Sequence, residues 1–114
     1  MFLFQPNVDK LVAKRNVKAL IKALRYTAPY VRRTAAEALG KLGDAKASEA
    51  AASYWISDEK WGKAIALGAP AVGPLSQVLA DESQPYKRRQ AAAQALRKIG
   101  GPQVVAPLIK VLAH

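Results

Sequence analysis

An internal repeat of a short apolar motif is the sequence feature that most restricts how this chain can fold. Residues 17–24 (VKALIKAL) match residues 105–112 (VAPLIKVL), and residues 72–79 (VGPLSQVL) form a third copy. Each copy places apolar residues at positions i, i+3 and i+7, which form one stripe of an α-helix. The copies at 72 and 105 are 33 residues apart, close to the period of two-helix repeat units. The sequence therefore predicts a stack of similar helical units.

A second motif follows two of these copies. Residues 31–43 (VRRTAAEALGKLG) match residues 88–100 (RRQAAAQALRKIG) at an offset of 57. Helical spacing predicts a buried face at positions 35, 38, 39 and 42, which positions 92, 95, 96 and 99 repeat. The two segments are therefore predicted to be equivalent helices.

Capping residues and glycines divide the chain into eight predicted helices. Asn7, Asp44 and Ser57 are predicted N-caps, and Gly43 and Gly68 are predicted to end helices. No stretch alternates with period two over strand length, so no sheet is expected. The predicted helices span residues 8–15, 16–26, 29–43, 45–55, 58–67, 70–82, 85–99 and 102–113.

The motifs at 31–44, 88–100 and 107–112 resemble the HEAT-like repeats also called phycobilisome-lyase HEAT repeats. The resemblance implies an all-α fold, a short right-handed α-solenoid of antiparallel helix pairs with about seven or eight helices. A single domain over residues 1–114 is predicted. It is divided into two regular units at about 8–43 and 70–100, an atypical segment at 44–68 and a terminal helix at 102–113.

The atypical segment contains both tryptophans, Trp55 and Trp61, beside Tyr54. One interpretation is an aromatic pocket for a ligand or partner. The favoured interpretation is that these side chains fill space between small helix faces, because aromatic residues supply large apolar area.

The sequence lacks the residues that most site chemistry requires. It has no cysteine, and its one histidine is the last residue, His114. A structural zinc site needs about four nitrogen or sulfur ligands, and a serine or threonine nucleophile needs a nearby base. We therefore predict no catalytic residue, no metal site and no cofactor, and the chain is not expected to be an enzyme.

The net charge of +10 is concentrated at the two ends. Residues 1–43 carry +7, residues 44–82 carry −3, and residues 83–114 carry +6 without an acid. Second helices of the units line the concave face in the families that this chain resembles, and a row of cations there would attract an acidic partner. The alternative, which the sequence leaves open, is that these cations are structural or solvated. The predicted partner-binding residues, which we call the basic set, are Arg32, Lys41, Arg89, Arg97 and Lys98.

The terminal helix has apolar residues around more than one narrow stripe. Val104, Leu108 and Val111 are the predicted docking face for another protein, or for a second copy of this chain as a homo-oligomer. The alternative is that they are ordinary surface residues.

These features favour a non-catalytic scaffold that binds a protein with an acidic surface. One alternative is a nucleic-acid-binding module that uses basic helix faces, and another, from the resemblance alone, is an accessory subunit of a lyase-like enzyme. No apolar run approaches the ~18 residues of a membrane span, and no export signal is evident, so a cytoplasmic location is expected.

Overall fold

The computed structural model describes residues 6–112, which contain eight α-helices, two 3₁₀ turns and no strand. Each predicted helix is present, most of them shorter by a few residues, and residue 113 lies outside the described range. The 3₁₀ turns, Ala69–Ala71 and Pro102–Val104, lead into the sixth and eighth helices. In chain order the helices are α1 (Val8–Ala13), α2 (Val17–Ala23), α3 (Pro29–Lys41), α4 (Ala45–Ser57), α5 (Trp61–Leu67), α6 (Val72–Ala80), α7 (Tyr86–Ile99) and α8 (Val105–Leu112).

Side-chain caps begin three of the helices. Asn7 accepts from the backbone N–H of Lys10 at 3.2 Å, and Asp44 accepts from that of Ala47 at 2.9 Å, which confirms both predicted caps. Asn16 caps α2 in the same way. A side-chain oxygen at this position satisfies an N–H group that has no partner within the helix.

The predicted start of the fifth helix is wrong, because α4 runs through Ser57 and α5 begins at Trp61. Glu59 adopts a left-handed backbone (φ +57°), and the N–H of Lys60 donates to the carbonyl of Trp55 at 2.8 Å. This is a Schellman ending, which usually has glycine at the left-handed position. Since Glu59 stands there instead, no glycine marks the end of one helix before the next begins.

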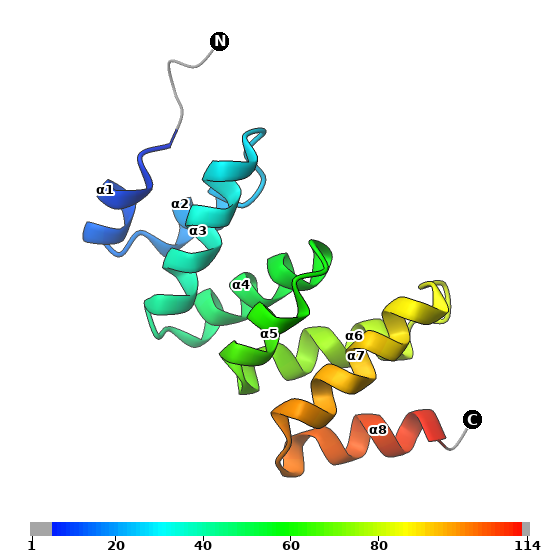
Figure 1. Cartoon of the computed structure of the whole chain (residues 1–114). Coiled ribbons are helices and arrows are strands. Elements are labelled where there is room, and N and C mark those ends of the chain that lie inside the picture. Colours follow the sequence, from blue (N-terminus) through cyan, green and yellow to red (C-terminus); the bar gives the residue numbers. More distant parts are fainter. Residues whose placement is uncertain (1–5, 113–114) are drawn as a thin grey trace.

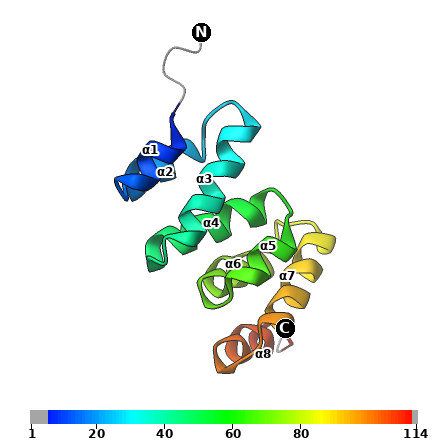
Figure 2. The ribbon, with the colours of Figure 1, turned by 60° about the vertical axis from the view of Figure 1, so that its left-hand side comes forward.

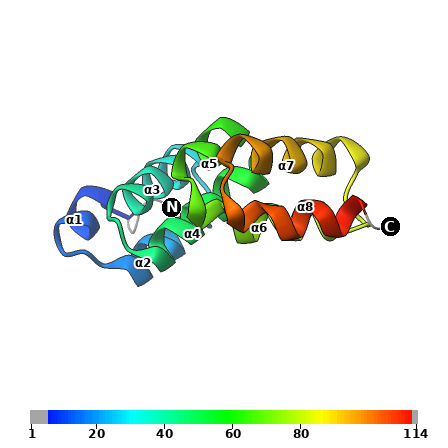
Figure 3. The same ribbon diagram turned by 90° about the horizontal axis from the view of Figure 1, so that it is seen from below.

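The helices form two layers in a long stack (Figure 1). One layer holds α1, α3, α5 and α7, and the other holds α2, α4, α6 and α8 (Figure 3). Helices follow one another from α1 at one end to α8 at the other (Figure 2), over 51 × 27 × 18 Å. The predicted all-α solenoid is confirmed.

The core consists of leucines and alanines that recur with the repeat. Leu39 and Leu96, which are 57 residues apart, are both fully buried, and so are Leu20 and Leu75 in the other motif. Alanines beside them, such as Ala35 and Ala92, are also fully buried, and their small methyl side chains let neighbouring helices approach closely. Leu108, the third leucine of the apolar motif, is only half-buried. The structure shows no helix beyond α8 to cover it within residues 6–112.

Candidate partner-binding surface

Two members of the basic set perform the same structural task. The Arg32 Nη1 donates to the carbonyls of Tyr26 (2.8 Å) and Thr27 (3.0 Å). Arg89 Nε donates to the carbonyl of Gln84 at 3.2 Å, and Gln84 is 57 residues after Thr27. Each guanidinium therefore binds the turn that precedes its own helix, which supports a structural role for these two arginines. Both side chains are half-buried.

Lys41 lies at the end of α3, apart from the other members of the basic set. It is exposed and lines a hollow of about 410 Å³ between α1 and α3. Asp9 and Glu37 line the same hollow. These carboxylates reduce the positive potential around Lys41.

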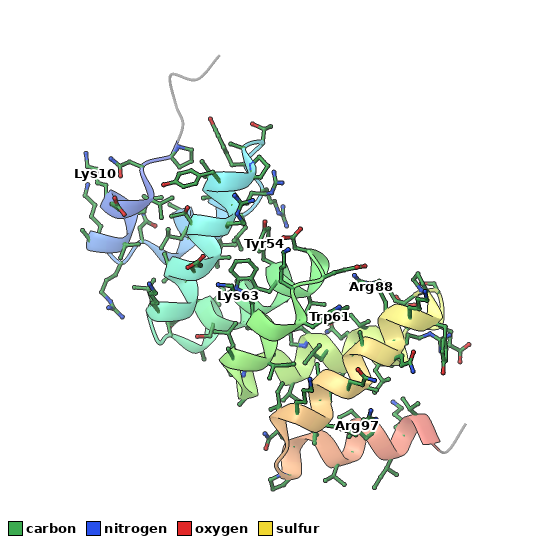
Figure 4. The ribbon with its side chains drawn as sticks, in the orientation of Figure 1. Lys10, Tyr54, Trp61, Lys63, Arg88 and Arg97 are labelled. Carbon is green, nitrogen blue, oxygen red and sulfur yellow. The ribbon has the colours of Figure 1, made fainter. Side chains whose placement is uncertain are left out.

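Arg97 and Lys98 occupy the last turn of α7 and are both exposed. Cations at this end of a helix interact favourably with its dipole. Arg97 lies on the side of α7 that faces α8 (Figure 4), where it lines a groove together with Arg89. The structure thus brings Arg89 and Arg97 together, whereas Arg32 and Lys41 belong to α3, on the far side of α5.

The groove between α7 and α8, which we call the α7–α8 groove, has a volume of about 400 Å³. Its lining is mostly apolar, with two cations on the α7 side. A second hollow of about 560 Å³ adjoins it between α6 and α8, and the two share Leu79, Arg89 and Val111. The groove is lined by Leu79, Tyr86, Arg89, Gln90, Ala93, Arg97, Leu108 and Val111.

The predicted docking face on the last helix needs one correction. Val104 is only 5% exposed because it packs in the core, so it offers no surface to another molecule. Leu108 is half-buried and Val111 is 38% exposed. Val105 and Ile109, at 50% and 57%, are more exposed than any of the three. The most exposed apolar side chains of α8 therefore lie on a different side of the helix from the predicted docking face.

Arg88 is the residue whose role the sequence analysis missed. It is the 57-residue equivalent of Val31, which is buried, and its own side chain is 20% exposed. Its guanidinium donates to Glu59 (3.2 Å) and Gln84 Oε1 (2.9 Å), and lies 5.5 Å from the ring centre of Trp61 (Figure 4). Arg88 therefore ties α7 to the α4–α5 turn. An arginine at a position where the repeat has a buried valine was the available signal.

The two tryptophans differ in environment. Trp55 is 4% exposed and packs in the core, where the ring of Tyr54 meets it edge-on at 5.3 Å. Trp61 is partly buried under Arg88. Both contacts support the interpretation that these rings fill space between helices.

Asp81 organises the turn between α6 and α7. The Ser83 hydroxyl donates to its carboxylate at 2.6 Å, the Ser83 N–H at 3.0 Å, and the Gln84 amide at 3.3 Å. These hydrogen bonds, chiefly that of the Ser83 hydroxyl, lower the pKa of Asp81 below its usual 3.8. The carboxylate thus holds the turn whose Gln84 carbonyl accepts from Arg89.

In the described part of the chain, no group of three or more His, Cys, Asp or Glu residues is placed to hold a metal ion. None of the helices in residues 6–112 has the length and hydropathy needed to cross a membrane.

Comparison with known families gives two matches. A family model for HEAT repeats matches residues 9–69, which is more than half of the chain and includes the segment 44–68 with both tryptophans. A model for the PBS lyase HEAT-like repeat matches residues 88–114. Comparison with curated proteins gives no match.

Proposed function

Since this chain belongs to the HEAT-repeat family, we propose that it is a non-catalytic scaffold that binds a protein with an acidic surface through its basic C-terminal end. HEAT repeats generally mediate protein–protein interaction or scaffolding. A stack of packed helices suits this task, because a surface that is already ordered loses little conformational entropy on binding.

The observation that carries the proposal is that no member of the basic set forms an ion pair with a carboxylate in the described part of the chain. Among residues 6–112 the ion pairs are Lys63–Glu37 (3.8 Å) and Arg88–Glu59 (3.2 Å). Arg89 lies near Asp81, whose pKa it helps to lower, but Arg97 and Lys98 are exposed, and no acid occurs in residues 83–114. An acidic partner would therefore meet a positive potential around Arg97 and Lys98 that no carboxylate of the same segment offsets.

The division of the chain into units at 8–43, 44–68, 70–100 and 102–113 remains part of this proposal. Under it, the two basic ends belong to regular units and flank a mildly acidic middle. The partner is expected to contact the end formed by α7 and α8, since Arg89 and Arg97 lie together there.

Capture of partners from a nuclease-treated lysate tests the proposal when it is combined with charge reversal. The wild-type chain is compared with a variant carrying Arg97→Glu and Lys98→Glu. The matched control carries Lys46→Glu and Lys60→Glu, which make the same change of charge at exposed positions in the middle of the chain. We expect an acidic protein that wild type and control retain and the first variant loses.

Two outcomes would contradict this proposal. Equal capture by all three proteins would show that the basic C-terminal end does not select the partner. Capture of nucleic acid alone, in a parallel lysate without nuclease, would support the nucleic-acid alternative, whose affinity should also fall steeply with salt.

A further inference from the structure

Among the described residues, α8 has fewer helix neighbours than the helices in the middle of the stack. In the described part of the chain, α2 packs between α1 and α3, and α4 packs between α3 and α5. α8 packs on α6, and no later helix covers its outer side within residues 6–112. The α7–α8 groove opens between these last two helices, which lie at one end of the stack (Figures 1 and 3).

The two walls of the groove differ in chemistry. On α8, Leu108 and Val111 line it, three residues apart and so on one side of that helix. Leu108 is half-buried and Val111 is 38% exposed. On α7, Ala93 lies between Arg89 and Arg97, four residues from each, so cations stand on both sides of a small residue. A ligand that fits both walls is apolar toward α8 and acidic toward α7.

The length of the groove suits a short helix. Its α7 wall extends from Tyr86 to Arg97, which is about 16 Å along a helix, or about three turns. Amphipathic helices bind such grooves through apolar anchors at i, i+3, i+4 and i+7.

We propose that the α7–α8 groove binds one amphipathic helix of a protein partner, with its apolar stripe on Leu108 and Val111 and its acidic flank on Arg89 and Arg97. This inference rests on the proposed function and names the partner's recognition element. A second copy of this chain fits poorly, because residues 83–114 carry +6 and no acid, so two such ends repel each other.

The test uses three synthetic 14-residue peptides with a fluorescent label, measured by fluorescence anisotropy. The first has leucine at i, i+3, i+4 and i+7 and glutamate on one flank. The second replaces the leucines with serine, and the third replaces the glutamates with glutamine. We expect the first peptide to bind at least tenfold more tightly than either of the others.

Variants of the protein locate the binding site. Val111→Glu and Arg97→Glu change exposed side chains that line the groove, and each should weaken binding of the first peptide at least tenfold. Lys87→Glu changes an exposed residue of α7 that does not line the groove, and should alter the affinity for the first peptide less than about twofold. Circular dichroism of each variant verifies that the helices are retained.

Several results would overturn the inference. If the serine peptide binds as tightly as the leucine peptide, acidic charge alone is recognised, and the proposed function stands while the groove does not. If light scattering shows a dimer that Val111→Glu dissociates, the occupant is a second copy. If an oligonucleotide displaces the peptide and binds the Val111→Glu variant unchanged, the occupant is a nucleic acid. If none of the acidic peptides binds at low salt and capture also finds no acidic protein, the proposed function fails as well.

Discussion

Replacement of Arg88 by alanine should destabilise the protein by about 2 kcal/mol. The lost interactions are a partly exposed ion pair with Glu59, which contributes about 0.5 kcal/mol, and the cation–π contact with Trp61, about 0.5 kcal/mol or more. The hydrogen bonds to Gln84 (2.9 Å) and to the carbonyl of Ile56 (3.4 Å) contribute about 1 kcal/mol together. Urea unfolding followed by circular dichroism measures the loss directly, and the midpoint of thermal unfolding should fall by roughly 8 °C.

The matched control is Lys87→Ala, one residue away on the same helix and exposed. It should change the free energy of unfolding by less than about 0.5 kcal/mol. A double-mutant cycle with Glu59→Gln isolates the ion pair, and the coupling should be about 0.5 kcal/mol. If Arg88→Ala costs no more than the control, Arg88 does not tie α7 to the α4–α5 turn, and the reasoning is refuted.

Three further predictions concern turns and caps. Asp44→Ala should cost about 1 kcal/mol in urea unfolding, because α4 loses its N-cap; no loss would argue against the cap. Arg32→Met should lower the free energy of unfolding by about 1 kcal/mol, because the hydrogen bonds to two backbone carbonyls are lost. Arg33→Met, at an exposed position, should lower it much less. Ser83→Ala should raise the pKa of Asp81 toward 3.8 in a carboxyl titration by NMR, since the hydroxyl is the main cause of its lowering. The stabilisation from Asp81 is present above 3.8 and lost as the pH falls through the lowered pKa; an unchanged pKa in the variant would contradict this.

The helices and their core could be predicted because both depend on local patterns. Leu20, Leu39, Leu75 and Leu96 stand at helical spacing within repeated motifs, and all four are fully buried. Asn7 and Asp44 could also be predicted as caps from local sequence, because a cap binds a backbone N–H within three residues of its own position.

The remaining features depend on contacts between helices that are distant in sequence. Arg89 and Arg97 stand eight residues apart on α7, so helical spacing alone places them on nearly one side of it. Whether Arg32 and Lys41 join them depends on how α3, α5 and α7 stack, which no local pattern encodes. Val104 is buried because a 3₁₀ turn precedes α8 and sets which side of that segment faces the core. The left-handed Glu59 escaped prediction because residues other than glycine rarely adopt this conformation.

The open, 51 Å long stack affects how a bound ligand changes amide hydrogen exchange along the chain. Each helix contacts only near neighbours along the chain, and nothing joins α1 to α8 within the described residues. Amide hydrogen exchange should therefore be fastest at the two ends and slowest around α4, because terminal helices can open without disturbing the rest. A ligand at one end should slow exchange there and leave the opposite end unchanged, so a deuterium-uptake map would identify the occupied end without any substitution.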